Sequence, residues 1–129
     1  MKRNIVFDFY NVLYDPEVKE VRSAVLDCLE KLHNDGVSLF LFTNSRECFL
    51  KHVDSKFGFL KYFNGVVSCY KDRKPSGWSF KRLKEVVDDD YESMVLIDDS
   101  ERNLSVAKDL GISTVRFQTV NDLSLINGV

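Results

Sequence analysis

The chain has 129 residues, of which 44% are hydrophobic and 29% are charged, and its formal net charge is -2 at pH 7. This length is enough for one domain with a real hydrophobic core and too short for two, so we expect a single domain over residues 1–129. The charge balance gives no overall basic field and therefore no strong signal for a nucleic-acid partner.

Cysteine usage and hydropathy indicate a cytoplasmic protein. The three cysteines are scattered and show no CxxC spacing, which argues for a reducing compartment and against a disulfide framework or a zinc site. No apolar run reaches membrane-spanning length. The first residues lead directly into a strand pattern and not into a signal-peptide pattern, so we expect neither a membrane association nor a leader.

The N-terminal part of the chain is predicted to alternate strand and helix. Residues 3–8 form a strand pattern, a run of β-branched and aromatic residues that stops at an aspartate. A helix is predicted over residues 15–34, because Asp-Pro-Glu has the pattern of a helix start and apolar side chains then recur at helical spacing. The almost continuously apolar run 37–42 is typical of a parallel strand covered on both faces. A second helix is predicted over residues 45–57, with Ser45 as its N-cap.

The middle of the chain contains a short strand pattern over residues 65–69, followed by a basic loop that ends at Lys74. Pro75 is predicted to open the next helix, and we expect Trp78 on that helix to serve core or helix packing and not to be a substrate platform. The helix fades at the aspartate run 88–90, which is interpreted as a solvated loop because the glycine and terminal glutamate of an EF-hand loop are missing.

The C-terminal part repeats the same alternation. Residues 94–97 form a strand that ends at paired aspartates, and a helix follows over residues 100–110. A last strand is predicted over residues 112–117, with a short helix from residue 119. The pattern predicts an α/β fold, a three-layer, doubly wound, Rossmann-like domain with a parallel sheet of about five strands.

Polar residues stand where three predicted strands end. Asp8 ends the first strand, Thr43 follows the second, and the pair Asp98–Asp99 ends the fourth. Because parallel strands end at one edge of a sheet, we expect these groups to converge there. Clustered carboxylates repel one another without a cation, and oxygen ligands favour Mg²⁺. With the ammonium of Lys74, the Thr43 hydroxyl would complete a phosphoryl-binding site, although Lys71 and Arg73 are alternatives for the cation.

These segments resemble the four motifs of the haloacid dehalogenase (HAD) superfamily of phosphohydrolases. The residues that carry the resemblance are, in chain order, Phe7-Asp8-Phe9-Tyr10-Asn11-Val12-Leu13, Phe40-Leu41-Phe42-Thr43-Asn44, Lys74-Pro75, and Leu96-Ile97-Asp98-Asp99-Ser100-Glu101-Arg102-Asn103. Each motif alone is weak, but the ordered set is specific and spans nearly the whole chain.

The resemblance implies a role for each site residue. Asp8 would attack phosphorus and form an aspartyl-phosphate. Thr43, Asn44 and Lys74 would bind the phosphoryl group, and Asn103 would be a supporting group. The groups implied as ligands of Mg²⁺ are Asp8, the backbone carbonyl of Tyr10, Asp98 and Asp99.

Position 10 departs from the family pattern. The family's phosphatases usually carry there a second aspartate, which protonates the leaving group and then activates water, but this chain has Tyr10. A phenol of pKa about 10 is poorly matched to this work near neutral pH, and losing such a group typically costs roughly 10²–10⁴ in rate. Asp15 is the candidate substitute. A tyrosine also occurs in the true dehalogenases, but these typically lack the acidic pair that Asp98–Asp99 keeps.

The spacing of the motifs leaves no room for a cap domain. This resembles the capless group of the family, whose open sites accept large substrates or are covered by another subunit. We therefore predict an Mg²⁺-dependent phosphomonoesterase that acts on a phosphorylated small molecule or macromolecule, slowed by the Tyr10 replacement. Two alternatives stay open: a non-catalytic HAD-like module that binds Mg²⁺ and a phosphorylated ligand, and a dehalogenase. The sequence leaves the oligomeric state open.

Overall fold

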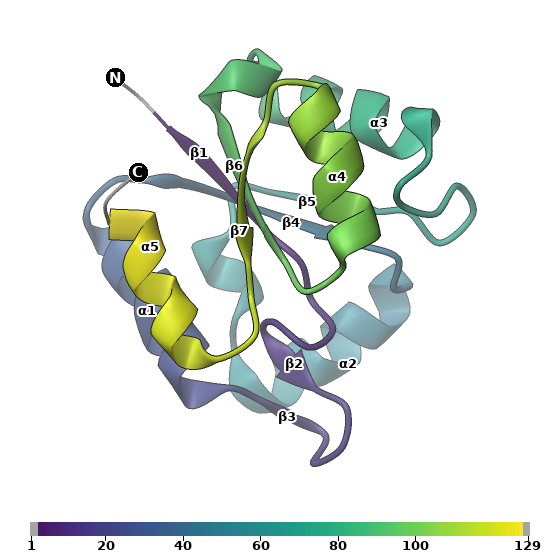
Figure 1. Cartoon of the computed structure of the whole chain (residues 1–129). Helices are drawn as coiled ribbons and strands as arrows, with labels where there is room; N and C mark the ends of the chain where they lie inside the picture. The colour runs from purple at the N-terminus through teal and green to yellow at the C-terminus, as the bar shows by residue number, and fades with distance from the viewer. Residues whose placement is uncertain (1–2, 128–129) are drawn as a thin grey trace.

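The centre of the fold is a five-stranded parallel sheet in the order β5-β4-β1-β6-β7, seen in a computed structural model that describes residues 3–127 (Figure 1). The strands are β1 (Asn4–Phe7), β4 (Ser38–Thr43), β5 (Gly65–Ser68), β6 (Met94–Asp98) and β7 (Ser113–Arg116). The central strand β1 pairs with β4 on one side and with β6 on the other. This arrangement confirms the predicted doubly wound parallel sheet.

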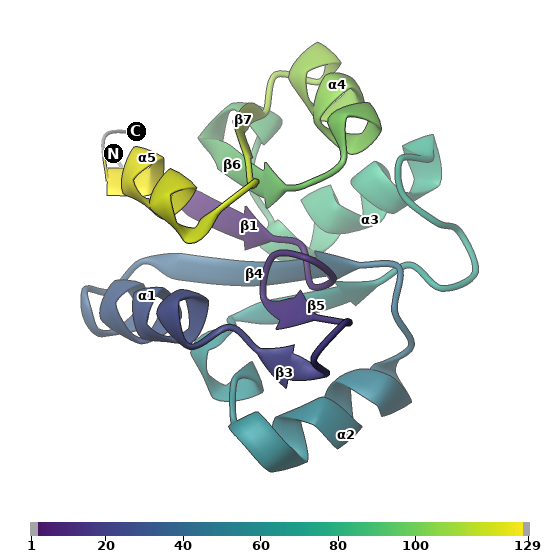
Figure 2. The ribbon, with the colours of Figure 1, turned by 60° about the horizontal axis from the view of Figure 1, so that its bottom comes forward.

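Helices cover both faces of the sheet, as Figure 2 shows. One face is covered by α1 (Ser23–Asn34) and α2 (Glu47–Phe57), with the short α5 (Ser124–Asn127) on the same side, and the other by α3 (Gly77–Val87) and α4 (Glu101–Asp109). A hydrophobic core lies on each face of the sheet, and successive residues of β1 point into opposite cores. Ile5 and Phe7 pack in the core under α1 and α2, and Val6 packs in the core under α3 and α4. This explains the continuous apolar run in β1 and confirms the three-layer architecture.

The connections contain no folded insert within the described residues. A two-stranded hairpin separates β1 from α1, and only α2 and a short 3-10 helix (Leu60–Tyr62) lie between β4 and β5. The described residues therefore include no cap domain. None of the helices in residues 3–127 combines the length and the apolar character that a membrane span requires.

The segment after β1 was wrongly predicted as a helix start. It forms an antiparallel hairpin of β2 (Tyr14–Asp15) and β3 (Glu20–Val21), and α1 begins only at Ser23. The Asp15 carboxylate accepts a hydrogen bond from the backbone N–H of Glu17 at 3.0 Å. A hydrogen bond of this kind can cap the start of a helix, but in this protein it closes the turn between β2 and β3. Aspartate side chains accept such backbone hydrogen bonds in both structures. Val18 lies in this turn and is 61% exposed instead of facing a helical core.

Most predicted helix ends agree with the structure. Gly36 and Gly58 adopt left-handed φ angles of 79° and 68° after α1 and α2, where a side chain would be strained. Two predicted starts shift along the chain. Ser45 does not cap α2, and α3 is capped by Ser76 instead of being opened by Pro75.

Of the two packing roles expected for Trp78, the structure excludes the core, because the side chain is 56% exposed, and leaves contact along its own helix, where Lys81 Nζ lies 5.9 Å from the centre of its ring. Helix α3 buries Phe80, Leu83 and Val87 on one face. Trp78 precedes Phe80 by two positions, which is about 200° around an α-helix, so it faces away from the sheet.

An aromatic cluster joins the hairpin to α2. We define it as Phe9, Tyr10, Tyr14, Phe49 and Phe59. Phe9 is fully buried at its centre and stacks on Tyr14, with ring centroids 5.1 Å apart and an interplanar angle of 6°. Tyr10 stacks on Phe49 of α2, with centroids 6.0 Å apart. The cluster therefore fixes the chain that follows β1 against the start of α2.

We expect Phe9→Ala to lower the free energy of unfolding by about 3–5 kcal/mol, since a large buried ring is replaced by a cavity. The measurement is urea denaturation followed by circular dichroism. Val18→Ala, at the exposed turn of the same hairpin, is the control and is expected to change stability by no more than about 0.5 kcal/mol. Equal effects of the two substitutions would show that the cluster does not anchor the hairpin.

Candidate active site

A buried lysine stands at the centre of the candidate site. The Nζ of Lys74 donates to Asp8 Oδ1 at 2.8 Å, to Asp98 Oδ2 at 3.0 Å and to the backbone carbonyl of Phe42 at 2.8 Å. Its side chain is 2% exposed, and all three ammonium protons are used. Burial alone would lower the pKa of Lys74. The negative charges of Asp8 and Asp98 raise this pKa by more than burial lowers it, so the net shift is upward and the side chain stays cationic. Lys71 and Arg73 are exposed and do not take this place.

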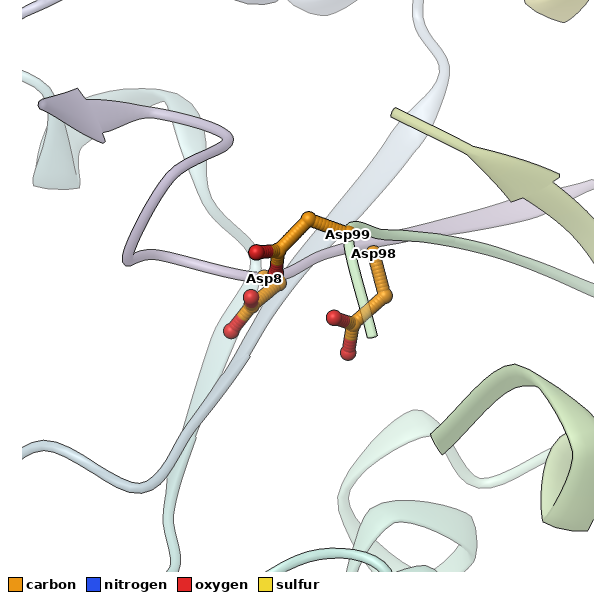
Figure 3. A group of neighbouring side chains, drawn as sticks. All are labelled: Asp8, Asp98 and Asp99. Carbon is orange, nitrogen blue, oxygen red and sulfur yellow. The ribbon is translucent and has the colours of Figure 1, made fainter. Parts of the chain in front are cut away.

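Three carboxylates gather at one place, as Figure 3 shows, and Lys74 forms ion pairs with two of them. One oxygen from each of Asp8, Asp98 and Asp99 lies within 4.8 Å of the others. The sheet register explains the convergence: Phe7 of β1 pairs with Ile97 of β6, so the residues that follow them stand side by side. The backbone N–H of Asp8 donates to the carbonyl of Ile97 at 2.9 Å and holds the two strand ends together.

Asp98 is held in place by further hydrogen bonds. Its Oδ1 accepts from the backbone N–H of Ser100 at 3.0 Å, and its Oδ2 accepts from Asn103 Nδ2 at 3.1 Å. Burial raises the pKa of Asp98, but the charge of Lys74 and these hydrogen bonds outweigh burial and hold the pKa below its usual range. Asp98 is therefore the carboxylate of the cluster that most firmly keeps its negative charge.

The other two carboxylates are harder to ionise. Burial raises the pKa of Asp8 to about 8 against the opposing charge of Lys74, and the charges of Asp98 and Asp99 add to the rise. Burial, followed by the charge of Asp98, also raises the pKa of Asp99. One ammonium does not neutralise three carboxylates, and their oxygen donors are the ligands that Mg²⁺ prefers. The cluster thus fits a divalent cation, which would favour the ionised form of each acid.

The end of β4 adds two polar groups. Thr43 is fully buried, and its Oγ1 accepts a hydrogen bond from the backbone N–H of Ser45 at 3.0 Å. Because this bond does not use the hydroxyl proton, the Thr43 O–H can still donate. Asn44 Oδ1 accepts from the backbone N–H of Lys74 at 2.7 Å. Asn44 therefore attaches the loop before α3 to the end of β4, which sets the position of the buried ammonium.

Tyr10, at the position of the family's acid, and Asp15, its candidate substitute, are both engaged in other contacts. The ring of Tyr10 belongs to the aromatic cluster. The Asp15 carboxylate lies 3.5 Å from Arg22 and also accepts the turn hydrogen bond from Glu17, so it serves the hairpin.

A cavity of about 280 Å³, which we call the mouth, opens beside these groups. The residues that line the mouth are Tyr10, Asn44, Ser45, Arg46, Phe49, Tyr70 and Arg73. Arg46 and Tyr70 were not among the predicted site residues, and Arg73 was considered only as an alternative to Lys74. No motif marks them, because loops that are distant in sequence bring them together.

Comparison with known proteins decides the family. A family model described as haloacid dehalogenase-like hydrolase matches residues 16–111. The chain belongs to this family. In this HAD-like hydrolase the match includes Thr43, Lys74 and the pair Asp98–Asp99, and it begins after Asp8.

A curated relative of the HAD-like hydrolase is the phosphoglycolate phosphatase of Vibrio parahaemolyticus, which is 24% identical over 111 residues. The aligned part covers 84% of this chain and 49% of that protein, so the chain spans about half the length of the relative.

Solved structures share the fold of this HAD-like hydrolase. A HAD family enzyme from Bacteroides thetaiotaomicron, in complex with magnesium and inorganic phosphate, is 20% identical with a TM-score of 0.78, over 92% of this chain and 95% of that one. The L-2-haloacid dehalogenase of Xanthobacter autotrophicus is 14% identical with a TM-score of 0.77, over 100% of this chain and 84% of that one. At these identities the likeness shows a common fold.

We expect Lys74→Met to lower the free energy of unfolding by about 3–5 kcal/mol in buffer without divalent cations, because the buried carboxylates lose their counter-charge. The measurement is chemical denaturation with a chelator present. Lys71→Met, an exposed lysine of the same loop, is the control and is expected to have an effect below about 0.5 kcal/mol. A Lys74 variant as stable as the Lys71 variant would mean that the ammonium does not hold the cluster together.

Proposed function

We propose that this HAD-like hydrolase is an Mg²⁺-dependent phosphohydrolase that cleaves phosphate monoesters through a covalent aspartyl-phosphate on Asp8. The observation that carries the proposal is the buried Asp8 carboxylate, bonded to Lys74 at 2.8 Å and grouped with Asp98 and Asp99. Two comparisons support it: the curated relative is a phosphatase, and one solved structure of the same fold holds magnesium and phosphate.

The residues that would hold Mg²⁺ are Asp8, the backbone carbonyl of Tyr10, Asp98 and Asp99. When bound, Mg²⁺ supplies positive charge that offsets the negative charge of the phosphoryl oxygens and of the carboxylates. Asn103 and Ser100 fix the Asp98 carboxylate in position for this role.

The chain's own side chains then account for the reaction. An oxygen of Asp8 forms a bond to phosphorus while the bond between phosphorus and the ester oxygen breaks. Thr43 holds a phosphoryl oxygen with its O–H donor, and the positive charge of Lys74, which lies against Asp8 at 2.8 Å, offsets the charge of the transferring group. The leaving oxygen takes a proton from water. A second water then attacks the phosphorus of the aspartyl-phosphate and gives its proton to the hydroxide that the first step left. The bond between phosphorus and the Asp8 oxygen breaks, which regenerates the Asp8 carboxylate and releases phosphate.

Tyr10 favours a second candidate function. Its ring packs in the aromatic cluster at the position where phosphatases of this family place an acid. A chain without that acid would act as a non-catalytic module that binds Mg²⁺ and a phosphorylated ligand. Magnesium-dependent binding of inorganic phosphate, without phosphate release from any ester, would favour the module. Halide release from a haloacid without added metal would instead favour a dehalogenase.

The covalent mechanism predicts that Asp8→Asn reduces phosphate release to background over a panel of phosphate monoesters. The asparagine has nearly the same shape but is not a nucleophile of comparable strength. The measurement is phosphate release with and without Mg²⁺. Glu85→Gln on the exposed face of α3 is the charge-matched control and is expected to keep wild-type activity. Unchanged release by the Asp8 variant would discard the aspartyl-phosphate.

The missing acid predicts a strong dependence on the leaving group. We expect slow release from alkyl phosphates such as sugar phosphates and faster release from aryl or acyl phosphates, because the latter leaving groups need little protonation. The difference is expected to be about 10²–10⁴ in kcat. Asp15→Asn is measured in parallel, and it should leave the ratio unchanged because Asp15 pairs with Arg22. Comparable rates on aryl and sugar phosphates would contradict this prediction.

A further inference from the structure

The mouth beside Asp8 is lined by cationic and aromatic side chains and contains no acid. It reaches the proposed catalytic groups through two of its own residues. Asn44 holds the backbone N–H of Lys74, and Tyr10 lies two positions after Asp8. A leaving group attached to a phosphoryl group at Asp8 would therefore extend into this cavity of about 280 Å³.

Arg46 and Arg73 give the mouth its charge. Both are exposed, and within residues 3–127 neither forms an ion pair with a carboxylate. Of the other arginines of residues 3–127, three have acidic partners and two, Arg3 and Arg102, have none. The pairs are Arg22 with Asp15 at 3.5 Å, Arg82 with Glu85 at 3.7 Å and Arg116 with Glu101 at 2.6 Å. The two guanidinium groups at the mouth thus retain donors for a ligand.

Arg46 is held in a defined place by the neighbouring loop. Its guanidinium lies 4.0 Å from the centre of the Tyr70 ring and donates to the Tyr70 hydroxyl. A guanidinium has five N–H donors, so this arrangement leaves most of them for another acceptor. Stacking on an aromatic ring also lowers the entropy lost when the arginine binds an anion.

The cationic surface continues beyond the mouth. A neighbouring cavity of about 490 Å³ shares Tyr10 and Phe49 with the mouth, and its charged lining residues are Lys19 and Lys56. This cavity also contains no acid, although the chain as a whole has a net charge of -2. Positive charge therefore predominates on this side of the mouth. On the other side, a cavity of about 440 Å³ shares Arg46 and Tyr70 with the mouth and has both acidic and basic side chains in its lining, including Glu47 and Asp72.

We propose that the natural substrate is a phosphate monoester whose leaving group carries a second anionic group, a carboxylate or a second phosphate, which Arg46 and Arg73 bind at the mouth. The proposal rests on the proposed function, since it places the scissile phosphate at Asp8. Planar guanidinium forks match the geometry of both anions. The rings of Phe49 and Tyr70 in the lining of the mouth suit a small planar leaving group that connects the scissile phosphate to the second anionic group.

The test compares two ligands that differ only in this second charge, 4-carboxyphenyl phosphate and its neutral amide 4-carbamoylphenyl phosphate. Their dissociation constants are measured by titration calorimetry with Mg²⁺ and the Asp8→Asn chain, which prevents turnover. We expect the carboxylate to bind about tenfold more tightly, the effect of a charge-assisted hydrogen bond. Equal affinities, or no binding of either ligand, would overturn the proposal.

The same titrations with Arg46→Gln and Arg73→Gln, each added to Asp8→Asn, separate direct contact from general attraction. Direct contact predicts that each substitution weakens only the carboxylate ligand, by several-fold, and that Arg46→Lys retains part of the preference. Equal weakening of both ligands would mean that the arginines attract only the shared phosphate, and would overturn the proposal. Arg116→Gln removes the same charge on the far edge strand β7 and is expected to keep the full preference.

A separate readout distinguishes failure of this proposal from failure of the proposed hydrolysis. Phosphate release is measured on both ligands with the unaltered Asp8 chain. Selective binding of the carboxylate without release would keep the assignment of Arg46 and Arg73 and refute hydrolysis. Release from both ligands with equal affinities would keep hydrolysis and refute the assignment. Thermal unfolding of each arginine variant verifies that the fold is retained.

Discussion

The arrangement of the site depends on one buried ammonium group. Lys74 reaches from the loop before α3 and bonds to Asp8 after β1, to Asp98 at the end of β6 and to a carbonyl of β4. One cation therefore joins the ends of three neighbouring strands. Without this cation, the carboxylates that the parallel register of β1 and β6 brings together would repel one another at the ends of these strands. The same side chain thus offsets part of the negative charge of the acids and joins the three strand ends.

The sheet and the meeting of the acids could be predicted because both follow from simple patterns. Apolar runs that stop at Asp8, Thr43 and Asp98 identify strands and their ends, and parallel pairing places those ends on one edge. The resemblance to the HAD superfamily, carried by the ordered motifs, is confirmed by the family match. The roles of individual residues as nucleophile and metal ligands go beyond this and stay predictions, because position alone does not define chemistry.

The predictions that differ from the structure share one physical cause. A local sequence pattern carries no information on the contacts between residues that are distant along the chain. Asp-Pro-Glu at positions 15–17 is equally suited to a helix start and to a turn, and the stacking of Tyr14 on Phe9 favours the hairpin. Trp78 is apolar, yet its helix turns it away from the sheet. Arg46 and Arg73 lie in ordinary loops, and only the folded chain brings them to one cavity.

The position of Tyr10 in the aromatic cluster constrains how this chain could evolve. An aspartate there would supply a proton donor, but it would also remove the ring that stacks on Phe49 and helps to anchor the hairpin to α2. Under the proposed function, an acid at this position would therefore be gained together with a loss of packing between the hairpin and α2, unless neighbouring rings changed at the same time.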